Sequence, residues 1–290
     1  MKWPARQPPG RIAYVDGRYL PHGSACVHVE DRGLQLGDSI YEVFRITAGR
    51  FLDEAEHLDR LERSLGEIEM AMPVPRAALQ FIAREVARRN AVTEGLLYIQ
   101  VTRGAYHRDH PIPAPAAKPT LIVTAHRLDT AAIARRRESG VAVITAPDLR
   151  WGRCDIKTTQ LLANLLAKTA ARRAGAFEVW LTDAAGFVTE GASTSAWIVS
   201  QDGTLITRDL STAILPGVTR QVLLKAAKDA HISVVERAFT PADATLAREA
   251  FLTAASAAAI PVVRIDGVPI GDGKPGPLTR RLAELYGASA

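Results

Sequence analysis

The sequence predicts a protein of two domains that mix α-helices with β-strands. The chain has 290 residues, which is long for a single hydrophobic core. Short β-rich runs bounded by turn residues recur along it, and apolar residues at helical spacing lie between them. A polar stretch over residues 128–140 separates two groups of such elements. We therefore expect an N-terminal domain over residues 1–127, an interdomain connection over 128–140 and a C-terminal domain over 141–290.

The N-terminal domain is expected to begin with a hairpin over residues 13–20. Asp16 and Gly17 form its turn, because an Asp-Gly pair is a strong two-residue turn signal. Residues 39–46 alternate as a strand does, so that successive side chains point to opposite faces. One face carries Tyr41, Val43 and Arg45, and the other carries Ile40, Glu42, Phe44 and Ile46.

Two helices are expected to follow this strand. Asp53 and Glu56 have the spacing of a capping box, which would open the first helix. The apolar stripe of that helix consists of Leu58, Leu61, Leu65 and Ile68. The second helix follows Pro75 and runs to about Asn90. Two further strands are expected at residues 96–102 and 120–125.

A long segment rich in proline, RGAYHRDHPIPAPAAKP, occupies residues 103–119 between those two strands. Proline excludes regular structure there, because it lacks a backbone N–H and has a fixed φ. Loops of this length in compact domains are usually functional or disordered. The segment is therefore a candidate functional loop.

The C-terminal domain is predicted to contain both strands and helices. Strands are expected at residues 141–145, 178–183, 196–200, 205–207, 250–254 and 262–270, the last of which folds back at Asp266 and Gly267. Helices are expected at residues 159–174, 217–231, 241–249 and 277–286.

The composition is that of an ordinary globular protein, with 47% hydrophobic and 23% charged residues. No apolar run approaches the ~20 residues that span a bilayer, so no membrane partner is expected. The first residues lack the apolar stretch of a signal peptide. Cys26 and Cys154 form no C-x-x-C pair. We therefore expect a cytoplasmic protein without disulfides.

The net charge of +5 would suit nucleic acid or another anionic partner. However, the arginines are spread along the chain. The densest cluster, Arg135 to Arg137, lies between two apolar segments and contains no aromatic residue. We interpret this cluster as a solvated part of the connection, and no nucleic-acid partner is expected.

Lys157 is the first candidate functional residue. It lies in RCDIKTTQLLANLLAK, residues 153–168, where a predicted strand meets a predicted helix. Only seven of the 36 basic residues are lysine, so a lysine in this position is notable. One interpretation is a strand-end lysine that extends its amine to solvent. The other is a desolvated amine that loses its charge and condenses with an aldehyde such as that of pyridoxal phosphate.

Pyridoxal phosphate also needs a phosphate site and a carboxylate for its ring nitrogen. LPGVTRQVLL, residues 215–224, is a Pro-Gly turn that leads into a helix, whose first N–H groups favour a phosphate. VTEGASTS, residues 188–195, places Glu190 in a small loop rich in hydroxyl groups. Taken separately, these motifs are also compatible with an ordinary capped helix and a surface turn. Arg60, which lies off the apolar stripe of its helix, would alone be interpreted as solvated.

Taken together, the motifs resemble those of the fold-type IV pyridoxal-phosphate enzymes. EHLDRL, VTRG, RCDIKT, VTEGASTS, ILPGVTR and AFLTAAS occur in this order. Within that group, EDRGLQLGDSIYEVFRI and RWGRCDIKTTQLLANLLAK are similar to D-amino-acid aminotransferases. The resemblance implies a mixed α/β fold with a small N-terminal α/β domain and a larger, β-barrel-like C-terminal domain with helices.

The resemblance also implies the residues that bind the cofactor, pyridoxal 5'-phosphate. Lys157 matches the Schiff-base lysine, Glu190 the acid that faces the pyridine nitrogen, and Arg60 a phosphate-binding arginine. Leu215, Val218 and Thr219 match the helix start that holds the phosphate. One of the phosphate contacts departs from the pattern. Ala255 stands where the family has a hydroxyl group, and the adjacent Ser256 is expected to replace that contact.

Substrate contacts follow from the same resemblance. Tyr41 matches a substrate-side tyrosine, and Arg108 and His110 match the R-x-H pair of D-amino-acid aminotransferases. In that family this loop reaches over the site of the neighbouring subunit and holds the substrate carboxylate, which implies a homodimer. No metal is expected.

The implied reaction is transamination between a D-amino acid and a 2-oxoacid, with D-alanine and 2-oxoglutarate as the default pair. Lys157 would also act as the proton shuttle. Alternatives of the same fold stay open: a branched-chain L-amino-acid aminotransferase, an (R)-amine transaminase or an aminodeoxychorismate lyase. The R-x-H pair argues against them. An alternative of another class is a basic protein that binds anions or nucleic acid without catalysis.

Overall fold

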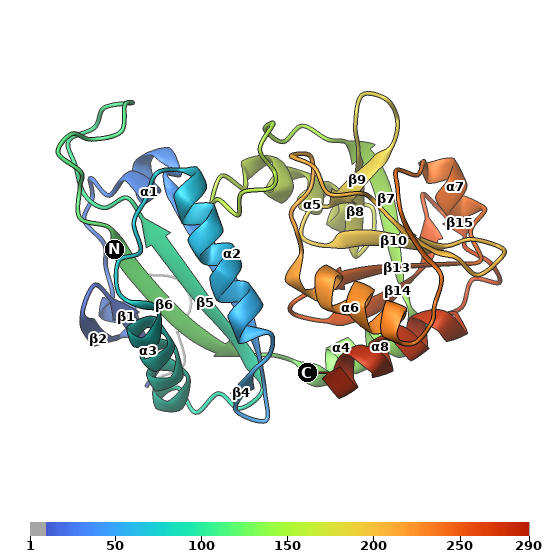
Figure 1. Cartoon of the computed structure of the whole chain (residues 1–290), viewed down its shortest axis with the longest axis horizontal. Coiled ribbons are helices and arrows are strands. Elements are labelled where there is room, and N and C mark those ends of the chain that lie inside the picture. The colour runs from blue at the N-terminus through green and yellow to red at the C-terminus, as the bar shows by residue number, and fades with distance from the viewer. Residues whose placement is uncertain (1–9, 290) are drawn as a thin grey trace. The chain divides into compact units, whose positions relative to one another are not determined.

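The computed structural model describes residues 10–289. The first nine residues, on which the expectation about a signal peptide rests, lie outside the described residues. The contacts between residues divide the chain into two units (Figure 1). Unit 1 runs to Leu128 and also includes Ile156–Gln160, whereas unit 2 consists of Asp129–Asp155 and the chain from Leu161 onward. The contiguous domain boundaries expected from the sequence stay a prediction.

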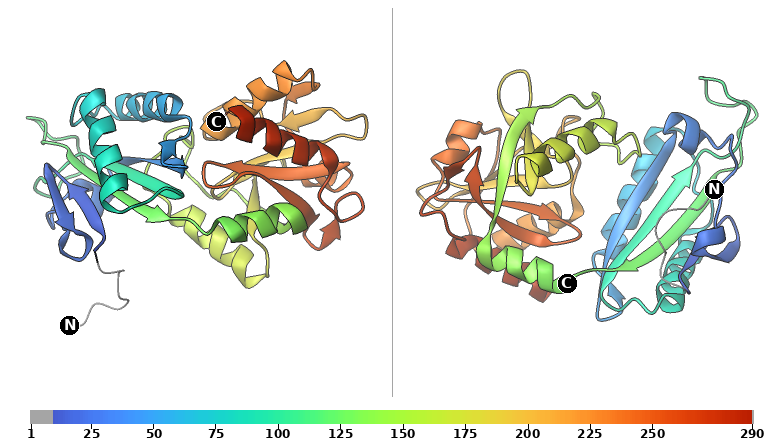
Figure 2. Two further views of the ribbon diagram at one scale, coloured as in Figure 1. Left: turned by 90° about the horizontal axis from the view of Figure 1, so that it is seen from below. Right: turned by 180° about the vertical axis from the view of Figure 1, so that it is seen from behind.

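Unit 1 is built on an antiparallel sheet of six strands in the order β2-β1-β6-β5-β3-β4. Its strands are β1 (Ile12–Val15), β2 (Arg18–Pro21), β3 (Ser39–Thr47), β4 (Arg50–Phe51), β5 (Gly95–Thr102) and β6 (Thr120–Arg127). Its helices are the 3₁₀ helix η1 (His22–Ser24), α1 (Arg32–Leu36), α2 (Glu54–Glu67) and α3 (Arg76–Arg89). Both α2 and α3 lie on the same face of the sheet (Figures 1 and 2).

The alternation along β3 decides which side chains lie beneath the helices. Ile40, Phe44 and Ile46 are buried with Leu58 and Leu61 of α2 in the hydrophobic core. The side chains on the opposite face of β3, those of Tyr41, Val43 and Arg45, are only half-buried, as the period of a strand requires. The predicted hairpin turn at Asp16 and Gly17 is confirmed.

The predicted capping box at the start of α2 is wrong. Asp53 is the N-cap residue, but its side chain makes no capping hydrogen bond. Its φ of 52° is left-handed, whereas a capping side chain needs the extended conformation to reach the first N–H groups. Ile68 is the residue that follows α2, and it is half-buried against the core that the rest of the stripe forms.

Unit 2 is built on a nine-stranded mixed sheet with the order β12-β11-β10-β13-β14-β7-β8-β9, in which β15 also pairs with β14. The strands are β7 (Val141–Pro147), β8 (Glu178–Thr182), β9 (Val188–Gly191), β10 (Ser195–Val199), β11 (Leu205–Thr207), β12 (Val234–Glu236), β13 (Glu249–Ala254), β14 (Ala258–Ile265) and β15 (Val268–Pro269). The helices are α4 (Thr130–Ser139), α5 (Leu162–Arg173), α6 (Val218–Asp229), α7 (Pro241–Thr245) and α8 (Pro277–Ser289).

Three parts of unit 2 differ from the sequence prediction. The expected connection contains helix α4, on which the arginine cluster is exposed as predicted. Helix α5 begins at Leu162, three residues later than expected. The segment around Glu190 is not a loop, because Val188–Gly191 forms strand β9, and all four of its residues are buried. No helix within residues 10–289 is long and apolar enough to span a membrane.

Candidate active site

The segment that carries Lys157 is attached to strand β3 of unit 1. Ile40 and Thr158 form a bridge pair. The backbone N–H of Tyr41 donates to the carbonyl oxygen of Lys157 at 3.0 Å, and that of Thr159 donates to Ser39 at 3.1 Å. The backbone of Lys157 is therefore held beside the first residues of β3, the strand that carries Tyr41.

The side chain of Lys157 is half-buried, between the buried residues Ile156 and Thr158. Its Nζ atom lies 4.3 Å from the centre of the Tyr41 ring, which stacks on Tyr98 with ring centres 5.7 Å apart. Burial, with a smaller effect of Tyr41, raises the pKa of Tyr98 to about 12. The lysine amine thus contacts aromatic surface, where an ammonium ion is attracted to the ring face.

Arg60 is buried rather than solvated, which corrects the interpretation drawn from its position on the helix alone. Its Nε donates to Oε1 of Glu42 at 2.7 Å, and its Nη2 donates to Oε2 at 2.9 Å. The Nδ1 atom of His57 lies 2.8 Å from Glu42 Oε2. Burial alone would raise the pKa of Glu42, but the charge and hydrogen bonds of Arg60, with His57, hold it well below its usual range.

Glu190 lies on strand β9 of unit 2 and is also buried. Its Oε1 atom accepts a hydrogen bond of 2.5 Å from Nη1 of Arg150 and one of 3.2 Å from the N–H of Leu215. Arg150 also binds both oxygens of Asp148, at 2.9 and 2.7 Å. Burial would lower the pKa of Arg150, but Asp148 and Glu190 raise it. Asp148 and Arg150 therefore form a fixed ionic support for Glu190.

Helix α6 begins close to this carboxylate, because the Leu215 N–H that binds Glu190 precedes the N-cap by two residues. The N-cap is Gly217, which supplies no side-chain capping bond, and Val218 is the first helical residue. Thr219 is buried, and its hydroxyl has no hydrogen-bond partner among the described residues. A buried hydroxyl without a partner is costly, which makes this helix start a candidate site for an acceptor such as a phosphate oxygen.

Ser256 and Ala255 lie in the turn that joins β13 to β14. Ser256 is half-buried, and α6 packs against β13, the strand that leads into this turn. Of the cofactor residues predicted in unit 2, Glu190 and Leu215 are joined by a hydrogen bond. It does not test whether Ser256 replaces the hydroxyl contact missing at Ala255.

Arg108 and His110 lie in the loop between β5 and β6 of unit 1, and both are exposed. Within residues 10–289, no hydrogen bond joins either side chain to Tyr41. The structure of this chain therefore does not bring the three predicted substrate residues into direct contact.

Arg150, Asp148 and Glu42 belong to the candidate site, but they are not among the residues that the sequence predicts for it. A signal existed for Glu42, which occupies the strand face shared with Ile40 and Phe44. A carboxylate on an apolar face needs a buried cationic partner, because an unpaired buried charge is very costly. Arg150 lies within the motif that carries Lys157, but nothing in its sequence context identifies Glu190 as its partner.

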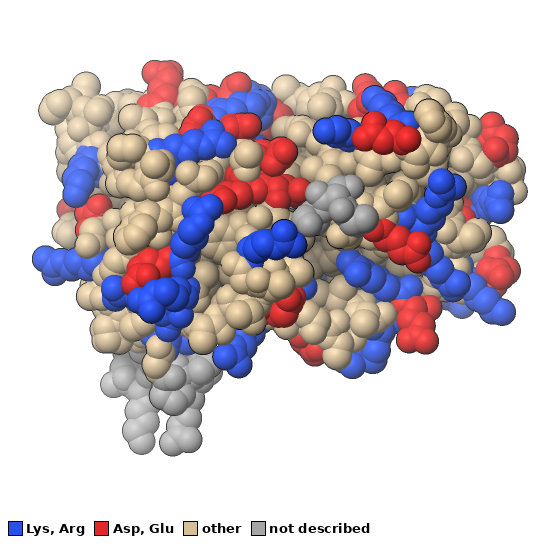
Figure 3. Space-filling view, turned by 60° about the horizontal axis from the view of Figure 1, so that its bottom comes forward, with Lys and Arg blue, Asp and Glu red and all other residues tan. Residues whose placement is uncertain are grey.

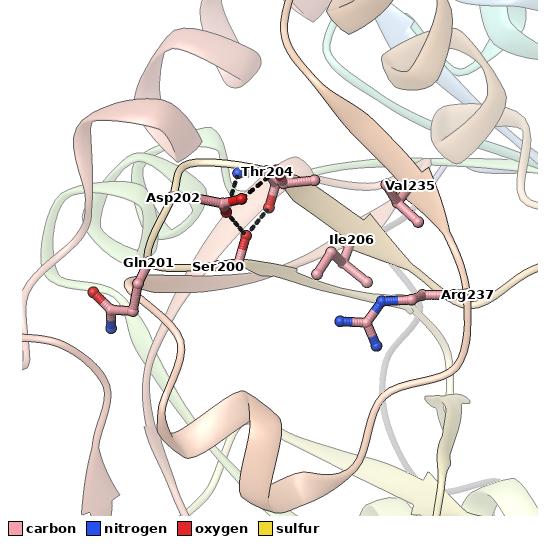
Figure 4. A pocket seen from close by; sticks show the side chains of 7 residues that line it. All are labelled: Ser200, Gln201, Asp202, Thr204, Ile206, Val235 and Arg237. Atoms are coloured by element: carbon pink, nitrogen blue, oxygen red, sulfur yellow. Dashed lines mark hydrogen bonds between the residues drawn. The ribbon is translucent and has the colours of Figure 1, made fainter.

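A shallow depression of about 500 Å³ in unit 2 contains none of the predicted site residues (Figure 4). It is lined by Ser200, Gln201, Asp202, Thr204, Ile206, Val235 and Arg237. Asp202 accepts hydrogen bonds from Ser200 Oγ at 2.5 Å and from Thr204 Oγ1 at 3.2 Å. These bonds close the turn between β10 and β11, so the polar groups there already serve the fold.

The chain is similar in sequence and in fold to known aminotransferases. The model of the amino-transferase class IV family matches residues 39–265. The D-alanine aminotransferase of Staphylococcus haemolyticus is 37% identical over 273 residues, which cover 94% of this chain and 95% of that protein. The branched-chain amino acid aminotransferase of Escherichia coli superposes with a TM-score of 0.88 at 26% identity, and covers 96% and 94% of the two chains.

A hypothetical aminotransferase from Mycobacterium tuberculosis, solved with bound pyridoxal phosphate, superposes with a TM-score of 0.83 at 26% identity, covering 96% of this chain and 98% of that one. These likenesses confirm the predicted mixed α/β fold of fold-type IV enzymes, with an antiparallel N-terminal sheet and a C-terminal sheet covered by helices. They also confirm the resemblance that the motifs indicate. The chain belongs to the class IV aminotransferase family, whose members depend on pyridoxal phosphate.

Proposed function

We propose that the protein transfers the amino group of a D-amino acid, by default D-alanine, to a 2-oxoacid, by default 2-oxoglutarate. The observation that carries this proposal is the 37% identity to a D-alanine aminotransferase over 94% of the chain. The structural likeness to a branched-chain aminotransferase, at 26% identity, favours the main alternative. The greater identity and the Arg108-x-His110 pair support the D-amino-acid assignment.

The residues present fit pyridoxal phosphate, which the family implies. A half-buried amine is available at Lys157, and a carboxylate at Glu190 is held by Arg150. The hydroxyl of Thr219, at the start of α6, has no partner among residues 10–289 and would gain one from a phosphate oxygen. When bound, the cofactor supplies an aldehyde for amines and a ring that withdraws electrons.

We assign a role in the reaction to each of these residues. Lys157 would hold the cofactor through its amine, and that amine would move the proton from Cα of the substrate. Glu190 would hold a proton at the ring nitrogen, and Arg150 keeps Glu190 oriented. The start of α6 would bind the phosphate. We also assign a phosphate contact to Arg60, as the resemblance implies, because a guanidinium binds phosphate oxygens through paired hydrogen bonds.

The handedness of the substrate depends on where its carboxylate is held. We assign this role to Arg108, whose guanidinium can bind a carboxylate through paired hydrogen bonds, with His110 and Tyr41 as further donors. With the carboxylate fixed in this way, the D-enantiomer would direct its Cα–H toward Lys157.

We further propose that the protein forms a homodimer. Helix α5 exposes three leucines, Leu162, Leu165 and Leu166, whose exposed fractions are 70%, 60% and 64%. A second copy of the chain would remove this apolar stripe from water. Leu165→Glu should therefore shift the protein toward the monomer in analytical ultracentrifugation. An unchanged dimer would exclude this helix from the interface.

The alternative of a basic anion-binding or nucleic-acid-binding protein is not supported by the face shown in Figure 3. On the face shown in Figure 3, Lys and Arg side chains are interspersed with Asp and Glu. This face therefore offers no broad basic patch of the kind that binds a phosphate backbone.

The proposed activity is tested with both enantiomers of alanine, glutamate and leucine as amino donors for 2-oxoglutarate. We expect the wild-type enzyme to prefer D-donors. Arg108→Ala should raise the KM for D-donors, because it removes a charge-assisted contact. A preference for L-leucine would favour the branched-chain alternative. An unchanged KM in Arg108→Ala would remove this residue from carboxylate binding.

A further inference from the structure

Arg108 and His110 lie in the loop over residues 103–119, and only the backbone of this loop positions their side chains. Among residues 10–289, neither of these side chains makes a hydrogen bond or ion pair. Both side chains are exposed, and the loop that carries them contains no helix. The direction of both side chains is therefore set by whatever fixes the peptide groups of this part of the loop.

Arg32 contacts those peptide groups from inside unit 1. It is the first residue of helix α1, and only 4% of it is exposed. Its Nη1 donates to the carbonyl oxygen of Asp109 at 2.7 Å, and its Nη2 donates to that of His110 at 3.3 Å. One buried guanidinium thus binds two successive carbonyls of the segment that carries Arg108 and His110.

The position of Arg32 is in turn fixed by the residues around α1. Asp31 caps the helix by accepting the N–H of Gly33 at 2.9 Å, and it also accepts the hydroxyl of Thr102 at 2.8 Å. A Cβ atom on Gly33 would lie 2.5 Å from Thr102 Cγ2, so only glycine allows α1 this close to the end of β5. The helix is therefore tied to the strand from which the loop departs.

A second set of contacts holds the base of the loop. Asp38 accepts Nε of Arg32 at 2.8 Å and Nε of Arg103 at 2.7 Å, so that one carboxylate orients both guanidinium groups. Arg103 also donates to the carbonyl oxygen of Ile68 at 2.6 Å. At the other end, a Cβ atom on Gly104 would lie 1.9 Å from the carbonyl oxygen of Lys118, so the two ends of the loop touch.

We propose that Arg32 is a positioning residue for the substrate carboxylate, acting through the backbone of Asp109 and His110. This inference rests on the proposed function, in which Arg108 and His110 bind that carboxylate. A guanidinium has five donors in a fixed plane and can bind Asp38 and two carbonyls together. A lysine has a single nitrogen on a flexible stem and cannot reproduce all three contacts. The identity of residue 32 thereby determines how well the loop is ordered before the substrate arrives.

The test compares the holoenzyme of Arg32→Lys with wild type, with Arg108→Ala, and with Lys118→Gln as the matched control. Lys118 is a basic residue of the same loop, but its side chain is 81% exposed and pairs only with Asp16 among the described residues. Two quantities are measured: amide hydrogen exchange of the peptide covering residues 104–118, and kcat and KM for D-alanine.

In Arg32→Lys we expect faster exchange in this peptide and unchanged exchange in β3 and β5. We expect KM to rise about 10-fold, because a small misplacement of a binding group has large kinetic effects, with kcat changed less than about twofold. Lys118→Gln should match wild type in both measurements. If Arg32→Lys is not recovered folded, Arg32→Gln, which keeps one amide donor, takes its place.

Two results would overturn the inference. Unchanged exchange in Arg32→Lys would show that Arg32 does not order the loop. Faster exchange with an unchanged KM, while Arg108→Ala raises KM, would show that the order of the loop does not matter for the carboxylate. The failure of the proposed function is distinguishable, because Arg108→Ala would then leave KM unchanged, and the positioning role would fall with it.

Discussion

Replacing Thr219 by valine should stabilise the cofactor-free protein and weaken the binding of pyridoxal phosphate. Thr219 is 4% exposed, and its hydroxyl has no partner among the described residues. Valine has nearly the same shape, so the packing at the start of α6 is retained while the polar atom is removed. The two effects have opposite signs, which a merely structural threonine would not produce.

The magnitudes follow from the state of this hydroxyl. A buried polar group without a partner costs about 1–3 kcal/mol, so Thr219→Val should raise the unfolding free energy of the cofactor-free protein by about 1 kcal/mol or more. A hydrogen bond to a charged group contributes about 1.5–3 kcal/mol, so its loss should weaken cofactor binding by roughly 10-fold to 100-fold.

The assay combines urea unfolding of the cofactor-free protein with a cofactor titration followed by absorbance. Ser64→Ala is the matched control, because Ser64 also has a buried hydroxyl without a partner in the described part of the chain, but it lies on α2 of unit 1. This control should gain stability and keep its cofactor affinity. The reasoning is refuted if Thr219→Val is less stable than wild type without cofactor, or if its affinity for the cofactor is unchanged.

Three further predictions concern Lys157, Glu190 and Glu42. Reduction of the holoenzyme with borohydride should fix the pyridoxyl group on Lys157, as peptide mapping would show, and Lys157→Ala should abolish turnover but not folding. Glu190→Gln should lower turnover by on the order of 10²-fold, roughly 3 kcal/mol in the barrier, because an amide cannot keep the ring nitrogen protonated; unchanged turnover would exclude this role. The pKa of Glu42 is lowered in the folded protein, so the stability that its ionised form contributes is present above about pH 4.3 and is lost as the pH falls below that value. Glu42→Gln should therefore be less stable at pH 7, because Arg60 loses its partner, and should lose less stability in acid; urea unfolding at pH 7 and pH 3 measures both.

Local patterns in the sequence predicted most of the elements, because hairpin turns and apolar stripes report directly on backbone conformation. The turn at Asp16 and Gly17 and the helix after Pro75 are examples. Strand β9 was missed, because Val188–Gly191 contains a carboxylate and a hydroxyl group that together suggest a polar loop. Its burial depends on Arg150 and Asp148, which are distant in sequence and which supply the partners that the buried polar groups need.

The candidate site was predictable only as far as motifs extend. Lys157, Glu190 and the start of α6 lie in segments with recognisable spacing. The pairing of Arg60 with Glu42 and the contact between Arg32 and the loop join residues that are far apart in sequence. Only the three-dimensional structure places these charges together, because the burial of a charge depends on tertiary contacts that no local pattern records.

The membership of Ile156–Gln160 in unit 1 has a consequence for the synthesis of the chain. Domains generally fold in order as they leave the ribosome, starting from the N-terminus. Here the first half of β3 lacks its outer neighbour until residue 160 has emerged, because Tyr41 is hydrogen-bonded to Lys157. A nascent chain that ends at Leu128 therefore has an open strand edge at Ser39 to Tyr41, which can pair with other chains. A fragment cut at Leu128 should aggregate more readily than one that also carries residues 156–160 through a short designed linker.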